Sequence, residues 1–167
     1  MTALAPLFVE VGTTLEEASG FFQYLLVFVF AAIPLVEILV VIPIAIGLGL
    51  DPVATGAAAF TGNVASVYAI VFAHHRLARW WRARRGKTDG ESSDRYARAR
   101  RVWDRYGLPG LSFGGPILTG VHIAAIAALV AGSRTRAVVG WMTISIGAWT
   151  VVLVAASAFG LSLLGVI

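Results

Sequence analysis

Ser112 is the residue whose surroundings best match an enzyme nucleophile, since it stands in the pattern Gly-x-Ser-x-Gly at residues 110–114. In many serine hydrolases this pattern holds the nucleophile at a sharp strand-to-helix turn, and an acid and a histidine complete the triad. Here the only later histidine is His122, and no Asp or Glu follows Asp104. We therefore predict that the chain is not an enzyme, and that Ser112 either bonds unwound backbone or contacts a ligand in a turn.

Glu37 is the residue best suited to proton transfer. It lies between Pro34 and Pro43 in a run of otherwise apolar residues. An ionised carboxylate inside a membrane costs about 2.5–3.5 kcal/mol on insertion scales, so we expect Glu37 to be protonated or paired. A protonatable carboxyl group at this depth is what a proton-coupled carrier requires. The alternative is a neutral side chain that bonds to carbonyl groups left free by the two prolines.

Further polar groups lie in the same apolar surroundings. His122 either pairs with Glu37, contacts an anionic headgroup or forms a structural hydrogen bond. Asn63 either bonds to a neighbouring helix or contacts a substrate. The backbone amides around residues 114–116 and around Thr119 and Gly120 are candidates for an anion-binding nest. The predicted substrate or proton site comprises Glu37, His122, Asn63, Ser112, Thr119 and Gly120.

The sequence predicts neither a metal ion nor a cofactor. The chain has no cysteine, which excludes thiolate ligands and disulfides. His74 and His75 are adjacent, and adjacent side chains on a helix point in different directions.

The composition indicates an integral membrane protein. Of the 167 residues, 58% are hydrophobic and 13% are charged, and the mean hydropathy is +0.82; an ordinary soluble domain has about 25% charged residues. The net charge is +4, and eleven of the thirteen Lys and Arg residues lie between Arg76 and Arg105, with Arg134 and Arg136 as the others. This segregation is more typical of a cytoplasmic loop than of a nucleic-acid surface. We expect a multi-pass protein in the cell membrane of a prokaryote that binds no nucleic acid.

The first apolar block, residues 21–50, fits neither one membrane span nor two. Thirty helical residues would be about 45 Å long, whereas the hydrocarbon core is about 30 Å thick and two spans need about forty residues. We predict a re-entrant hairpin in which 21–33 enters the membrane, 34–37 turns near its middle and 38–50 returns to the same face. One long, tilted and kinked span is the alternative.

Each half of the chain is predicted to contain a hairpin followed by a transmembrane helix. Residues 53–73 are predicted to form a transmembrane helix, 107–131 a second re-entrant hairpin, and 137–160 a second transmembrane helix. If the basic segment 74–105 is cytoplasmic, the hairpins enter from opposite faces and every Lys and Arg residue lies inside. The predicted fold is an all-α integral membrane protein with an inverted repeat of hairpin plus span, in one domain over residues 1–167. The helix breaks are assigned to Pro34, Pro43, Pro109 and Pro116.

Two amphipathic helices complete the prediction. Residues 3–19 place an apolar stripe opposite three glutamates, which favours a helix in the headgroup plane; a helix that caps the bundle is the alternative. The basic segment carries aromatic residues on one face among its arginines, so either it lies on an anionic leaflet or its charges only fix the orientation. The predicted headgroup contacts are Arg98, Arg101 and Arg105.

Three stretches resemble a known family. They are PLVEILVVIP at 34–43, GLGLDPVATGAAAFTGN at 47–63 and RYGLPGLSFGGPILTG at 105–120, and they are similar to the small multidrug export family, which is related to the DedA, or VTT-domain (SNARE-associated), membrane proteins. The resemblance implies opposed re-entrant hairpins and the movement of lipid phosphates or phospholipids across the bilayer, often tied to the proton gradient. The family's first motif has an arginine where this chain has Leu39, which removes the expected partner of Glu37.

We favour, from these features, a flippase-like or scramblase-like carrier of lipid phosphates or phospholipids that is proton-coupled through Glu37. Its expected partners are membrane lipids and anionic headgroups on the cytoplasmic face. The alternatives are a small multidrug or cation exporter and a non-transporting membrane assembly factor. Small residues on both spans are also compatible with a homodimer.

Overall fold

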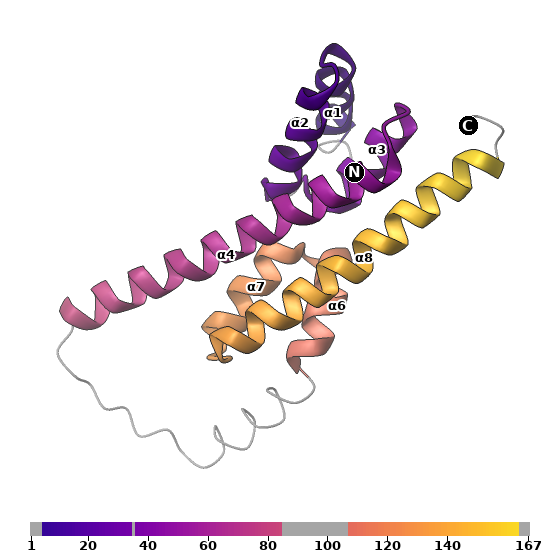
Figure 1. The fold of residues 1–167 in the computed structure, drawn as a ribbon. Coiled ribbons are helices and arrows are strands. Elements are labelled where there is room, and N and C mark those ends of the chain that lie inside the picture. The colour runs from indigo at the N-terminus through magenta and orange to yellow at the C-terminus, as the bar shows by residue number, and fades with distance from the viewer. Residues whose placement is uncertain (1–4, 35, 85–106, 164–167) are drawn as a thin grey trace. The chain divides into compact units, whose positions relative to one another are not determined.

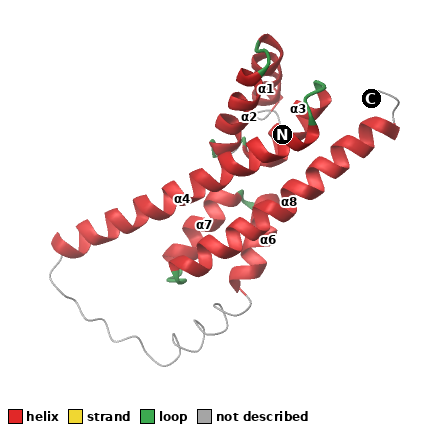
Figure 2. Ribbon diagram, in the orientation of Figure 1, coloured by secondary structure: helices red, strands yellow, loops and turns green. Residues whose placement is uncertain are grey.

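The computed structural model describes residues 5–34, 36–84 and 107–163. Within them the chain forms helices joined by short turns and loops, without a strand (Figures 1 and 2). The helices are α1 (Ala5–Glu17), α2 (Phe21–Ala32), α3 (Glu37–Gly47), α4 (Pro52–Arg84), α6 (Leu108–Leu118), α7 (Val121–Val130) and α8 (Thr135–Leu163). The predicted all-α fold is thus confirmed for the described residues. The predicted headgroup contacts Arg98, Arg101 and Arg105 lie outside them.

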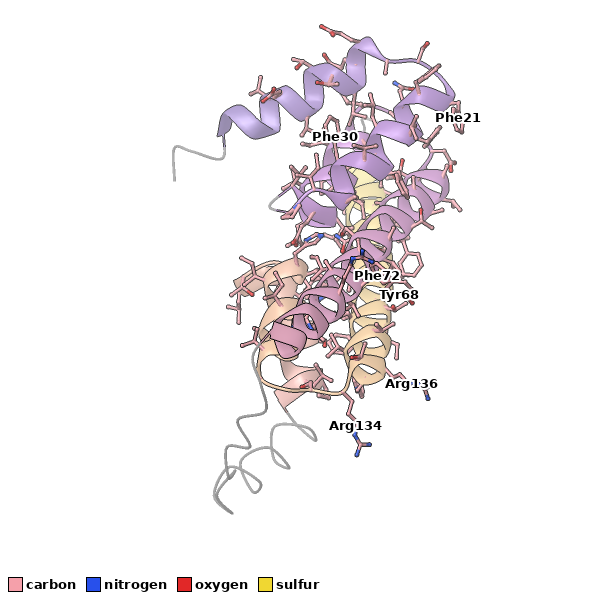
Figure 3. The ribbon with its side chains drawn as sticks, turned by 90° about the vertical axis from the view of Figure 1, so that its left-hand side faces the viewer. Phe21, Phe30, Tyr68, Phe72, Arg134 and Arg136 are labelled. Carbon is pink, nitrogen blue, oxygen red and sulfur yellow. The ribbon has the colours of Figure 1, made fainter. Side chains whose placement is uncertain are left out.

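Two helices are long and apolar enough to cross a bilayer. The candidate spans are Pro52–His74 in α4 and Thr135–Gly160 in α8, and at about 1.5 Å per residue each exceeds the roughly 30 Å hydrocarbon core. Most residues of each span are not buried, and Figure 3 shows Tyr68 and Phe72 pointing away from α4. Apolar side chains turned outward along a long helix suit lipid as the solvent. Beyond its apolar span α4 continues to Arg84, so the basic segment begins as helix.

Four short helices form two pairs. α2 and α3 have 12 and 11 residues, and α6 and α7 have 11 and 10. Each is therefore about 15–18 Å long, and none alone reaches across the hydrocarbon core. α2 contacts α3, and α6 contacts α7. Each segment predicted as a hairpin thus contains two half-length helices in contact.

The two joints within these pairs are made by different residues. Ile33 has an extended backbone (φ −79°, ψ 125°) ahead of Pro34, as expected for the residue before a proline. In the second pair Gly120 has φ 86°, a left-handed conformation that glycine adopts without steric cost. The first break is therefore made by a proline and the second by a glycine.

The other three prolines assigned to the breaks do not end a helix. Pro43 lies inside α3 and Pro116 inside α6, whereas Pro109 lies in the first turn of α6. A proline in the first turn has no intrahelical donor to lose. Inside a helix it removes one backbone hydrogen bond, but α3 continues past Pro43 because Ala45 and Ile46 are packed in the core.

The chain divides into two compact units. Unit 1 comprises residues 1–66 and 143–167, and so contains α1, α2, α3, the first part of α4 and the second part of α8. Its buried apolar side chains include Val11, Leu15, Val27, Ile38, Ile42, Ile46, Ala59 and Ile146. α4 and α8 run antiparallel here, because a Cβ atom added at Gly56 would meet Val154 and one added at Gly147 would meet Phe60.

In unit 1, α1 buries two residues of its apolar stripe, Val11 and Leu15, against the protein. α1 contacts α2 and α3, Val11 and Leu15 are buried, and the three glutamates of α1 are exposed. The Gln23 amide donates a hydrogen bond of 3.1 Å to the Leu15 carbonyl. These contacts favour the capping helix over one whose stripe dips into lipid, because side chains buried in protein are not available to lipid.

Gly62 allows α4 to approach α2 closely, since a Cβ atom at this position would overlap the backbone carbonyl of Phe28. We expect Gly62→Ala to lower the free energy of unfolding by about 1–3 kcal/mol, the usual cost of overpacking a filled core. The obstacle is backbone, so a side-chain rotation cannot relieve it. Denaturant unfolding in detergent measures the change.

Gly140→Ala in α8 is the matched control. No atom lies within 4 Å of a Cβ added there, and alanine is favoured over glycine in a helix by about 0.8–1.0 kcal/mol. A Gly62→Ala protein as stable as the Gly140→Ala protein would contradict the close approach of α2 and α4.

Unit 2 comprises residues 67–142, and so contains the second part of α4, α6, α7 and the first part of α8. Its buried apolar side chains include Val67, Leu108, Val121, Ala125, Ala128, Val138 and Met142. α6 and α7 are in close contact at Gly115, where an added Cβ atom would lie 2.6 Å from the Ala124 Cβ. Each unit therefore builds its core from one pair of short helices and one part of each long helix.

Candidate functional site

Glu37 is a buried acid at the joint of the first helix pair. Its side chain is 5% exposed, and it is the first residue of α3. The positive end of the helix macrodipole favours a carboxylate at this position. The sequence prediction placed Glu37 at the end of the turn, and the structure places it at the start of the returning helix.

The backbone of Glu37 is strained. Its φ of 41° is the only positive value at a non-glycine residue in the described part of the chain. Such conformations cost about 1–3 kcal/mol and persist where the surrounding structure imposes them, which is often at functional sites. Pro34 imposes an extended backbone at Ile33, and the packing of Ile38 fixes the start of α3. The surrounding packing therefore holds the carboxyl group in a position that the local sequence alone would not select, at the cost of this strain.

Asn63 is a fully buried amide in the first half of α4. Its exposed fraction is 0%, and neither Nδ2 nor Oδ1 has a hydrogen-bond partner among the described residues. It lies eleven residues after Pro52, about 16 Å along the helix and so near the middle of a 30 Å core. The helix-to-helix hydrogen bond weighed from the sequence is not formed within the described part. Its amide is thus free to bond to water or to a ligand.

Two buried threonine hydroxyls in unit 1 share this property. Thr55 in α4 and Thr150 in α8 are buried, and their Oγ1 atoms have no hydrogen-bond partner among the described residues. By contrast, Thr61 in the same helix donates to the Ala57 carbonyl at 2.7 Å, the usual arrangement for a helical threonine. Thr55 and Thr150 were not predicted as site residues, because nothing in the sequence distinguishes them from Thr61.

His122 is the counterpart of Glu37 in unit 2. Its side chain is 2% exposed, and it is the second residue of α7, directly after the joint at Gly120. In both pairs of short helices, a buried ionisable side chain thus lies in the first turn of the second helix. The predicted pairing of His122 with Glu37 stays a prediction, since the two residues belong to different units.

Ser112 is satisfied by its own helix. It lies in the middle of α6 and not in a turn, is fully buried, and donates a hydrogen bond of 2.8 Å to the Leu108 carbonyl. A hydrolase nucleophile needs an exposed hydroxyl on a strand-to-helix elbow. The expected position in a turn is wrong because the glycines around Ser112 do not interrupt the helix, whereas a ligand contact of Ser112 stays a prediction.

The anion-binding nest at Thr119 and Gly120 is also not formed. The two backbone N–H groups both donate to the Gly115 carbonyl, at 2.9 and 2.7 Å. They close the end of α6 in the way that helix C-terminal motifs do. Their donors are therefore turned into the protein and are not presented to an anion.

Unit 1 also contains an open apolar groove between α4 and α8, with a volume of about 540 Å³. Its walls include Val53 and Phe60 from α4 and Val151 from α8, and its exposed lining is entirely apolar. A volume of this size lies within the range of small-molecule sites, roughly 300–1,000 Å³.

Few types of polar or charged side chain are buried in the described interior. Its buried polar and charged residues are Glu37, Thr55, Asn63, Ser112, His122, Ser133, Ser145 and Thr150. None of these is a lysine or arginine, and no group of three or more metal-ligating side chains occurs in the described ranges. Glu37 is thus the one buried carboxyl group of the described interior, which contains no lysine or arginine that could bind a phosphate.

A sequence model of one protein family, described as "Putative small multi-drug export protein", matches residues 37–152. The match begins at Glu37 and includes α3, α4, the α6–α7 pair and α8 as far as Val152. No curated protein and no solved structure matches the chain.

Proposed function

Since the chain belongs to the family of small multi-drug export proteins, we propose that it is a proton-coupled membrane transporter that exports amphipathic cations. The observation that carries the proposal is the buried Glu37, held in a strained conformation at the joint of two half-length helices. Transporter sites lie where broken helices meet at membrane depth, and an intramembrane acid binds and releases protons there.

The composition of the two units supports an inverted repeat. Unit 1 combines the α2–α3 pair with the start of α4 and the end of α8, and unit 2 combines the α6–α7 pair with the end of α4 and the start of α8. If the two repeats have opposite orientations, each is expected to combine the start of one long helix with the end of the other. We infer that the two pairs are re-entrant hairpins that enter the membrane from opposite faces.

The distribution of charge supports the orientation. All thirteen Lys and Arg residues lie in the sequence range of unit 2, and unit 1 contains none. In the described part of unit 2, Arg134 and Arg136 are exposed at the start of α8 and point away from it (Figure 3). Because basic residues are retained on the cytoplasmic side, we place the end of α4 and the start of α8 inside, and the exposed Asp51 outside.

The buried charges of the described residues support a cationic substrate. Glu37 is the one buried acid in the described residues, and no buried lysine or arginine accompanies it. A phosphate would need a cation or several free donors; among the described residues no lysine or arginine is buried, and the backbone amides of Thr119 and Gly120 are already used. A cation that competes with the proton for Glu37 needs neither.

Lipid carriage, the function favoured from the sequence, is the second candidate. It is supported by the open apolar groove between α4 and α8, because a lipid that crosses the bilayer needs an apolar path for its tails. This candidate and the exporter make opposite predictions for dye uptake and for phospholipid redistribution in the same vesicles.

The test uses proteoliposomes that contain the purified chain. With an imposed proton gradient, we expect the vesicles to accumulate a fluorescent quaternary ammonium dye and to leave a fluorescent phospholipid in its original leaflet. Redistribution of the phospholipid without dye uptake would support the lipid carrier. Background levels in both assays would support the assembly factor and overturn transport.

A further inference from the structure

The groove between α4 and α8 is one leaflet deep. On α4 its lining runs from Pro52, at the start of the candidate span, to Phe60. Eight residues correspond to about 12 Å of helix, close to half of a 30 Å hydrocarbon core. The groove therefore starts at one membrane face and ends near the middle of the bilayer.

The inner end of the groove is closed by packing. Phe60 and Gly147 are the deepest lining residues on the two antiparallel helices, and a Cβ atom added at Gly147 would lie 3.5 Å from Cε2 of the Phe60 ring. Farther out, a Cβ atom added at Gly56 would lie 3.0 Å from Cγ2 of Val154. The two glycines are thus already used for the contact between α4 and α8, and neither is left to accept a third helix.

The length of the groove and its apolar lining indicate which molecule binds in it. A transmembrane helix from a second copy would be about 10–12 Å wide and would run the full 30 Å, twice the length of the groove. A single hydrocarbon tail covers one leaflet and needs no polar partner, and the exposed lining is entirely apolar. Asp51 lies at the outer end of the groove, where we expect the lipid-water boundary. It is exposed, and its Oδ1 accepts a hydrogen bond of 2.7 Å from the Ala54 N–H.

We propose that this groove binds one acyl chain of a membrane phospholipid from the leaflet at the start of α4, as a resident lipid of each chain. The lipid fills space that would otherwise be a void along the α4–α8 contact. The inference does not rest on the proposed transport, because a bound lipid can be counted without any substrate or gradient.

The test compares two neighbouring valines of α8. Val151 lines the groove and is 68% exposed, whereas Val152 is 53% exposed and is not part of the lining. Val151→Trp places an indole ring in the groove and obstructs it, and Val152→Trp makes the same change toward bulk lipid. Ala57→Leu, at an exposed lining position of α4, is the second variant in case the tryptophan at 151 prevents folding.

Each protein is reconstituted in vesicles of phosphatidylethanolamine and phosphatidylglycerol, extracted in mild detergent and weighed by native mass spectrometry. We expect one retained phospholipid per chain in the wild type and in Val152→Trp, and none in Val151→Trp. Equal lipid counts in all proteins would overturn the proposal. So would conversion of a dimer to a monomer by Val151→Trp alone, because the groove would then hold a second copy of the chain.

Discussion

Replacement of Glu37 by glutamine is expected to reduce proton-driven dye accumulation to the level of protein-free vesicles. Glutamine has nearly the same size and hydrogen-bonding groups but does not bind and release a proton, so the coupling is lost while the shape of the site is kept. The helix content should be unchanged, and we expect the free energy of unfolding to change by less than about 1.5 kcal/mol, as for size-conserving replacements. Dye uptake under an imposed proton gradient measures the effect.

Glu17→Gln is the control for this replacement. Glu17 is the last residue of α1 in the same unit and is exposed. The same loss of charge at this surface position is expected to leave dye uptake at the wild-type level. If both variants transport like the wild type, Glu37 has no role in proton coupling and the proposed mechanism is wrong.

Replacement of Asn63 by leucine is expected to stabilise the protein and impair transport. A buried polar group without a partner costs about 1–3 kcal/mol, and leucine of similar size removes that cost. The free energy of unfolding in detergent should therefore rise by about this amount. Dye uptake should fall, because the amide would no longer bond to the substrate or to the water that accompanies it.

Gln23→Leu is the matched amide-to-leucine control. The Gln23 amide donates to the Leu15 carbonyl and ties α2 to α1, so its loss should lower the free energy of unfolding by about 0.5–1.5 kcal/mol. A loss of stability in Asn63→Leu as large as that in Gln23→Leu would mean that the Asn63 amide makes an internal bond. Asn63 would then be a structural residue.

The lengths of the helices could be predicted from the sequence, because they depend on chain length and membrane thickness. Residues 21–50 are too long for one span and too short for two, and the structure divides them at Pro34 into helices of about half the membrane depth. Glu37 was found in the same way, since an acid in an apolar run is visible without any coordinates. The family match begins at that residue.

The packing of the same elements could not be predicted from pattern. Pro43 lies inside α3 because buried residues on both sides of it pack in the core, and Pro116 is itself buried inside α6. The stripe of α1 faces α2 and α3, and a stripe of the same composition would also suit a membrane surface. That Asn63 has no hydrogen-bond partner among the described residues depends on which groups surround it in space.

The most direct test of the account is the side of the membrane on which the ends of the first helix pair lie. The chain has no cysteine, so Ser19→Cys and Asp51→Cys each introduce a single exposed thiol just outside α2 and α3, and Arg134→Cys introduces one before α8. We expect a membrane-impermeant maleimide added to intact cells to label positions 19 and 51 and not 134. Labelling of 19 and 51 from opposite sides would contradict the re-entrant hairpin and the transport site built on it.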